Sequence, residues 1–324
     1  MTKSASNNLT KYPQAYAVKH KDIDVRMASR SGGVFTALSD YILHNNGVIY
    51  GCSLDENYMA IHTRAVTKSE RDGFRGSKYI QSELRDIFKY VKADLCEGKQ
   101  VLFSGTSCQV DGLQMYLSEV DTSKLLCVDI ICHGVPSPKV WKDYLKWTSK
   151  KYKGKITCVD FRNKKKYGWR DHVETIGIEN KLVDSRIFTT IFYRHQILRP
   201  SCFKCPYKSL THSSDITIAD FWGVENAVPG FDDNKGVSLV LINTSVGEGF
   251  YSKIKLHLSS VCCDANMCLQ EPLIGPFPEP IDRKQFWELY RKSKFSTITN
   301  KYGNNNIVSK IKKKVKIVLK KNKN

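Results

Sequence analysis

Short apolar runs recur through the first half of the chain, and helical spacing follows most of them. Val48–Leu54 predicts a strand, with Ala60–Val66 as its hairpin partner. Val101–Phe103 is an apolar run that ends in a Ser-Gly-Thr-Ser turn, after which Gln109–Leu117 has the periodicity of a helix. Leu125–Ile131 is a further apolar run, which predicts a buried strand. This alternation predicts an α/β protein of mixed α+β character, in which helices flank a central mixed sheet.

The remainder of the pattern is less regular. Ala15–Val18 predicts an edge strand, hairpins follow residue 150, and residues 246–303 predict a smaller C-terminal α/β appendix. We divide the chain into a disordered N-terminus (1–13), the N-terminal part of a ligand-binding domain (14–96), its C-terminal part (97–303) and a basic tail (304–324).

Four cysteines stand out by their setting. Cys108 begins a predicted helix after a strand, and Cys132 follows the next strand. Both therefore lie where open α/β sheets place ligands. Cys202 and Cys205 form a Cys-x-x-Cys pair between two prolines, a spacing found in redox dithiols, zinc sites and iron–sulfur sites. Together they supply the four thiolates that a 4Fe-4S cluster or a structural zinc ion requires. The alternative is that Cys108 and Cys132 are simply small buried side chains.

Two loops have residues suited to an anion. Ser31-Gly32-Gly33 precedes a run with helical spacing, and backbone N–H groups at a helix start favour phosphate; N-capping by Ser31 is the alternative. Gly76-Ser77-Lys78 combines flexibility, a hydroxyl and a cation before the next predicted helix. A polar loop without a ligand has the same composition.

Composition narrows the class of protein. The 324 residues include 11 cysteines, an odd number without the regular spacing of a disulfide framework, which favours a reducing cytoplasm. No apolar run approaches the length of a membrane span, and the first residues lack the apolar core of a signal peptide.

The net charge is +19, of which eight positive charges lie in residues 309–324. In that tail, apolar residues recur at helical spacing among the lysines, a pattern typical of a basic amphipathic helix on an anionic membrane surface. Peripheral attachment at the inner face of the membrane is therefore one expectation. A solvated tail, or one that contacts phosphates, is the alternative, and we do not favour nucleic acid as the partner.

Eight motifs occur in order along the chain. They are Ser31-Gly-Gly-Val-Phe-Thr-Ala37, Gly76-Ser-Lys-Tyr79, Val101-Leu-Phe-Ser-Gly-Thr-Ser-Cys-Gln109, Asp129-Ile-Ile-Cys-His-Gly-Val-Pro-Ser137, Phe161-Arg162, Gly168-Trp169, Arg199-Pro-Ser-Cys-x-x-Cys205 and Asp220-Phe-Trp-Gly223. In this order they resemble the beta subunit family of coenzyme F420 (deazaflavin) hydrogenase/dehydrogenase, in its truncated bacterial type. The resemblance extends from about residue 14 to residue 280.

The resemblance implies an iron–sulfur flavoprotein oxidoreductase that passes electrons between a 4Fe-4S cluster and FAD, and to or from a hydride-exchanging substrate. It implies Cys108, Cys132, Cys202 and Cys205 as the cluster ligands. The residues implied in FAD binding are Ser31, Gly32, Gly33, Gly76, Ser77, Lys78, Gly105 and Thr106. It assigns no catalytic residue.

The chain departs from the family pattern in ways that matter for its partners. Residues 1–30 contain no cysteine, where relatives often carry ferredoxin-like repeats, so we expect an external, ferredoxin-like electron donor. Ser107 replaces a usual proline. Relatives of the truncated type resemble proteins of bacterial surface-polysaccharide biosynthesis. The competing hypothesis is a non-redox accessory or binding protein that a zinc ion or cluster stabilises. Nucleophilic catalysis by Cys108 is a third reading.

Overall fold

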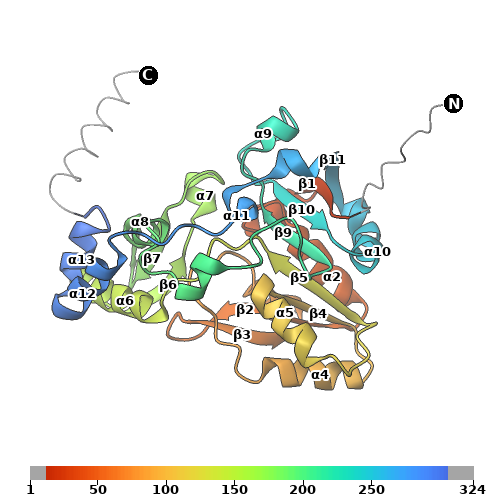
Figure 1. Cartoon of the computed structure of the whole chain (residues 1–324), viewed down its shortest axis with the longest axis horizontal. Helices are drawn as coiled ribbons and strands as arrows, with labels where there is room; N and C mark the ends of the chain where they lie inside the picture. Colours follow the sequence, from red (N-terminus) through yellow and green to blue (C-terminus); the bar gives the residue numbers. More distant parts are fainter. Residues whose placement is uncertain (1–11, 306–324) are drawn as a thin grey trace.

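The computed structural model describes residues 12–305, and two sheets form its framework (Figure 1). An eight-stranded sheet has the order β11-β1-β10-β9-β5-β4-β2-β3, and a three-stranded sheet has the order β6-β7-β8. The strands are β1 (Gln14–His20), β2 (Val48–Leu54), β3 (Ala60–Ala65), β4 (Val101–Thr106), β5 (Leu125–Ile130), β6 (Ile156–Asp160), β7 (Glu174–Ile178), β8 (Lys181–Ser185), β9 (Ile216–Asp220), β10 (Ser238–Ile242) and β11 (Leu258–Cys263).

The helices lie on both faces of the large sheet and around the small one. The longer ones are α2 (Val34–His44), α4 (Ile87–Cys96), α5 (Ser107–Tyr116), α6 (Pro138–Tyr152), α8 (Ile187–Tyr193), α10 (Ser245–Ile254), α12 (Arg283–Lys292) and α13 (Phe295–Lys301). The shorter ones are α1 (Ile23–Ala28), α3 (Lys68–Asp72), α7 (Lys164–Tyr167), α9 (Val224–Ala227), α11 (Glu271–Ile274), and the 3-10 helices η1 (Pro200–Lys204), η2 (Lys255–His257) and η3 (Ala265–Cys268). The predicted mixed α/β class, with a large sheet flanked by helices, is confirmed.

The middle of the large sheet is parallel. Strands β2, β4, β5 and β9 run in one direction, while β3, β10, β1 and β11 pair antiparallel with their neighbours. Both faces of the parallel part are buried, so its strands are nearly continuous apolar runs. Leu102 packs with α2 and α10 on one face, whereas Val101 and Phe103 pack with α4 and α5 on the other.

A second core forms around the three-stranded sheet. Trp141 of α6 is fully buried, with its ring centroid 4.6 Å from that of Phe161 and 4.7 Å from that of Phe188. Helices α12 and α13 complete this core, at the left in Figure 1, whereas α10 and β11 lie at the far end of the large sheet. The C-terminal part of the chain thus contributes to both ends of the molecule.

Strand β1 differs from its prediction as an edge strand. It pairs with β10 on one side and with β11 on the other, so it lies inside the sheet. Ala15, Ala17 and Val18 are accordingly almost fully buried. Both neighbours come from residues more than 200 positions later in the sequence, which local pattern does not reveal.

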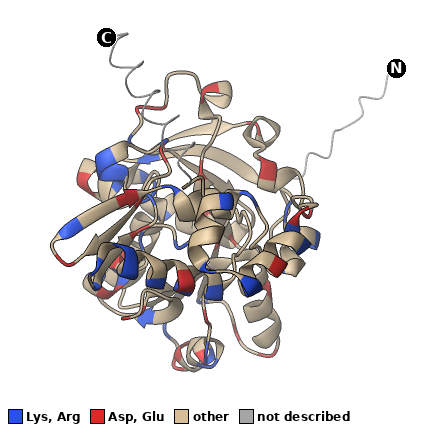
Figure 2. Cartoon of the chain, turned by 90° about the vertical axis from the view of Figure 1, so that its left-hand side faces the viewer, with Lys and Arg blue, Asp and Glu red and all other residues tan. Residues whose placement is uncertain are grey.

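Charged residues of both signs are mixed over the side of the molecule that Figure 2 presents. Within residues 12–305, no helix is long and apolar enough to cross a membrane. Of the predicted basic tail (304–324), residues 306–324 lie outside the described part of the chain.

Candidate functional site

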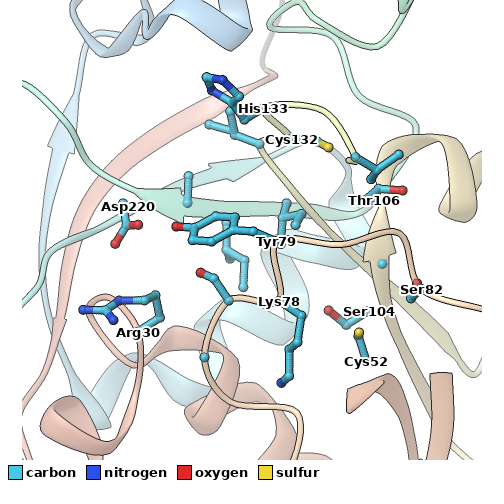
Figure 3. Close-up of a pocket in the computed structure, with 18 of the residues that line it drawn as sticks. Arg30, Cys52, Lys78, Tyr79, Ser82, Ser104, Thr106, Cys132, His133 and Asp220 are labelled. Carbon is cyan, nitrogen blue, oxygen red and sulfur yellow. The ribbon is translucent and has the colours of Figure 1, made fainter. Parts of the chain in front are cut away.

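A cavity of about 1460 Å³ lies at the carboxyl ends of the parallel strands β4, β5 and β9 (Figure 3). Thr106 ends β4, Ile130 ends β5 and Asp220 ends β9, and all three line the cavity. This is the edge of an open α/β sheet at which ligands bind. The volume exceeds the ~300–1,000 Å³ of an ordinary small-molecule site, so the cavity has room for a dinucleotide-sized ligand.

The turn before α2 forms one wall of the cavity. Gly33 takes the N-cap position of α2 with a positive φ of 94°, and no side chain caps the helix. The Ser31 hydroxyl instead donates to the Val237 carbonyl at 2.6 Å, so the alternative of N-capping by Ser31 is wrong. Ser31 and Gly33 line the cavity. The adjacent Gly32 does not, because it packs against Val18 and Ser238, where a Cβ would lie 2.1 Å from the Val18 carbonyl oxygen.

The loop at residues 76–78 lines the cavity as a unit. Gly76 has a φ of 82°, a conformation that favours glycine, and nothing lies within 4 Å of the position its Cβ would take. The Lys78 amine donates to the carbonyls of Gly73 at 2.8 Å and Arg75 at 2.9 Å, which ties the loop to the preceding turn. Burial lowers the pKa of Lys78 to about 8. Lys78 is therefore still mostly protonated at pH 7 and available to an anion.

The turn after β4 joins the cavity to the first cysteine. Gly105 and Thr106 both line the cavity. Thr106 caps α5 through a reciprocal arrangement with Gln109, whose side-chain oxygen accepts from the Thr106 backbone N–H at 2.9 Å. The Thr106 hydroxyl lies 3.2 Å from the Cys108 sulfur. All the residues predicted to bind the flavin, except Gly32, thus lie on the cavity wall.

The four predicted ligand cysteines are brought together beside the cavity. Cys108 and Cys132 line it, and Cys202 and Cys205 lie in and just after η1. Burial raises the pKa of Cys132 to about 12, and the neighbouring Cys202 and Cys108 thiols contribute in the same direction. Burial likewise raises the pKa of Cys202, with contributions from Cys205 and Cys108. The thiols are thus close enough to influence one another.

In the surroundings of these thiols, the Lys208 amine favours their thiolate form. Gly134, with a φ of 127°, leaves room for η1, because a Cβ there would lie 3.0 Å from Leu198 and 3.5 Å from the Cys202 Cβ. Lys208 interacts electrostatically with Cys132, Cys205 and Cys202, and its amine donates to the His133 carbonyl at 3.0 Å. Four sulfur donors fit a 4Fe-4S cluster or zinc in number and type, and a bound metal centre would offset the mutual repulsion of the four thiolates. In residues 12–305 the side chains as they stand form no group of three or more metal ligands.

The sequence pattern did not predict a function for several polar residues at the cavity. The Arg162 guanidinium is 1% exposed and donates to the Asp220 carboxylate, which also accepts from the Trp169 indole N–H at 2.5 Å. In Figure 3, Arg30 and Asp220 lie on the same side of Tyr79, whose hydroxyl points toward Asp220. The motifs Phe161-Arg162 and Asp220-Phe-Trp-Gly223 were visible in the sequence, but nothing in them shows that these residues meet.

The fold and the site define a ligand-binding α/β protein, with its cavity at the sheet edge and four cysteines beside it. The family profile for the C-terminal part of the coenzyme F420 hydrogenase/dehydrogenase beta subunit matches residues 98–260, half of the chain. The chain therefore belongs to this family, as its motifs predicted, and the family is one of oxidoreductases.

A solved structure supports the fold. It comes from a study of xenon derivatization of the F420-reducing [NiFe] hydrogenase complex from Methanosarcina barkeri, with a TM-score of 0.53 and 19% sequence identity. The similarity covers 77% of this chain and 82% of that chain. No curated protein matches the chain significantly in sequence.

Proposed function

We propose that the chain is an iron–sulfur flavoprotein oxidoreductase, which binds FAD in the cavity and a 4Fe-4S cluster on Cys108, Cys132, Cys202 and Cys205. The observation that carries the proposal is that one cavity is lined both by the predicted flavin loops and by two of the four cysteines. When bound, FAD would supply hydride exchange and the cluster one-electron transfer.

The residues of the chain have separate parts in this proposal. Lys78 and the backbone around Gly33 and Gly76 bind and orient the phosphates. The turn that carries Thr106 places Cys108 at the cavity wall, where its thiolate would hold the cluster next to the proposed flavin site.

Anaerobic purification with iron, sulfide and flavin analysis tests the proposal. We expect a coloured protein with FAD and about four irons, and serine at any of the four cysteines should abolish the iron–sulfur absorbance. Cys96 and Cys158 are exposed and lie outside the cavity, so Cys96→Ser and Cys158→Ser are matched controls that should keep it. A colourless protein that contains zinc would instead support the non-redox accessory protein. A cluster that persists in Cys202→Ser would refute the ligand set.

The proposal also includes partners. The structurally similar protein belongs to a hydrogenase complex, which supports the proposal that this chain exchanges electrons with another protein, such as a ferredoxin-like donor. The lysine-rich tail supports reversible attachment to an anionic membrane surface, since each basic residue there contributes about 1 kcal/mol. A hydride partner in surface-polysaccharide biosynthesis fits this location.

A further inference from the structure

One end of the cavity holds a cation without a matching anion. The Arg30 Nη1 group donates to the Arg162 carbonyl, but the Nε and Nη2 groups of Arg30 are buried and have no hydrogen-bond partner among the described residues. The carboxylates that influence Arg30 are Asp220 and Asp160. Neither forms a hydrogen bond or ion pair with Arg30 within residues 12–305.

Arg162 adds a second guanidinium at the same place. Its side chain is 1% exposed, and its Nη groups are bound to Asp220, Tyr79 and Trp169. Its Nε group is buried without a partner in the described part of the chain. Asp220, the carboxylate that interacts with both guanidinium groups, already accepts from Arg162 and Trp169, and three guanidinium nitrogens have no partner within residues 12–305.

This arrangement is costly for a protein that binds nothing there. Buried polar groups are almost always hydrogen-bonded, and a buried charge without a partner destabilises the fold. Burial and the nearby Arg162 lower the pKa of Arg30, but only to about 10, so the charge persists at neutral pH. Arginine offers a planar set of donors that matches the oxygens of phosphate.

We propose that Arg30 and Arg162 form a subsite for the oxyanion of a phosphate-bearing ligand, at the end of the cavity marked by Arg30 and Asp220 in Figure 3. The oxyanion can come from the pyrophosphate of the flavin or from a second, anionic ligand that exchanges hydride with it. The identification of that source rests on the proposed function. The binding of an oxyanion by Arg30 and Arg162 does not depend on it.

The test uses the full-length protein, stripped of flavin, and inorganic pyrophosphate as the probe. Calorimetric titration should show binding that weakens at least about tenfold in Arg30→Gln, the effect of losing a charge-assisted contact. Arg30→Lys should recover only part of the affinity, because lysine lacks the planar donor set. Arg186 also lines the cavity but is paired with Asp171 at 3.0 Å, so Arg186→Gln is the matched control and should bind normally.

Thermal melting separates binding from a structural role. Removing an unpaired buried charge should leave the melting temperature of ligand-free Arg30→Gln unchanged or higher, while the rise that pyrophosphate causes in the wild type is lost. Equal pyrophosphate affinity in Arg30→Gln and the wild type, no binding by the wild type, or an equal loss in Arg186→Gln would overturn the subsite.

Comparing FAD with riboflavin, which has no phosphate, identifies the source of the oxyanion. If Arg30→Gln weakens FAD binding but not riboflavin binding, the subsite holds the flavin pyrophosphate. If both bind normally and the flavin-loaded wild type still binds pyrophosphate, the subsite serves the second ligand. Failure of the proposed function would appear differently, as a protein that binds pyrophosphate through Arg30 but takes up neither flavin nor iron.

Discussion

Replacing Asp220 by asparagine should destabilise the protein more than any substitution of a surface carboxylate. Asp220 accepts from the Arg162 guanidinium and the Trp169 indole, and its side chain is 13% exposed. Burial raises the pKa of its carboxyl, but Arg162, with help from Trp169 and Arg30, outweighs burial and brings the pKa below its usual value. Asp220 is therefore charged in the folded protein.

The magnitude follows from what the substitution leaves behind. Asparagine keeps an oxygen for the Trp169 N–H, but it leaves the almost fully buried Arg162 guanidinium without a counter-ion. Breaking a buried ion pair in this way costs about 3–5 kcal/mol. Arg30 lies close enough to repel Arg162, so the loss should not fall below this range. It is a large part of a typical stability of about 5–15 kcal/mol.

Urea unfolding at pH 7, followed by circular dichroism, measures this loss. Asp171→Asn is the control, because the pair of Asp171 with Arg186 is about half exposed on both sides and should contribute about 1 kcal/mol or less. Because the folded pKa of Asp220 is lowered, its stabilisation is present above about pH 4 and is lost as the pH falls through the folded pKa. The difference between wild type and variant should shrink in the same direction. A loss in Asp220→Asn no larger than in Asp171→Asn would refute the reasoning.

Three further outcomes are expected. Gly32→Ala should cost about 1–3 kcal/mol in unfolding free energy, since its Cβ would lie 2.1 Å from the Val18 oxygen, whereas Gly249→Ala in α10 meets nothing within 4 Å and should be neutral or slightly stabilising. Lys78→Ala should weaken FAD binding by roughly 1–3 kcal/mol at pH 7, and the wild-type affinity should fall as the pH rises above about 8 while that of the variant stays flat; unchanged affinity would remove Lys78 from the site. Full-length protein should co-sediment with anionic liposomes and a chain ending at Val308 should not; equal behaviour would exclude the tail as an anchor.

The central strands and the placement of two cysteines could be predicted because their signals are local. An apolar run, a Ser/Gly turn and a helical period occur within a few residues of Cys108, and they correspond to β4, its turn and α5. Cys132 follows β5 in the same way. Parallel strands next to each other then bring their carboxyl ends together, whatever the rest of the chain does.

The role of Gly32 shows where local pattern fails. A glycine-rich turn before a helix is equally compatible with N–H groups directed at a ligand and with close approach of two backbone segments. In the structure the Gly32 N–H donates to the Ser238 hydroxyl at 2.9 Å, and the missing side chain allows the turn to approach β1 and the start of β10 closely. Only the tertiary partner, 206 positions away, distinguishes the two uses.

Arg30 and Arg162 were inaccessible to sequence reasoning for a related reason. They are 132 positions apart, and each is an ordinary cation in a chain that has 51 lysines and arginines. They differ from the other cations because some of their guanidinium nitrogens lack a hydrogen-bond partner in the described part of the chain. Only the three-dimensional structure, which gives all the neighbours, shows this. Most of the other lysines and arginines within residues 12–305 are partly or fully exposed to water.

The exposed and the buried cations of the protein therefore differ in what they indicate about its function. The side shown in Figure 2 carries charged residues of both signs, and neutralising an exposed cation, which water solvates, changes little. Inside the cavity, burial removes water as a partner, and the fold tolerates an unpaired guanidinium only at the expense of stability. Such a residue persists when a ligand supplies the missing anion, which is why the incompletely paired cations Arg30 and Arg162, and not the net charge of +19, point to the chemistry of the ligand.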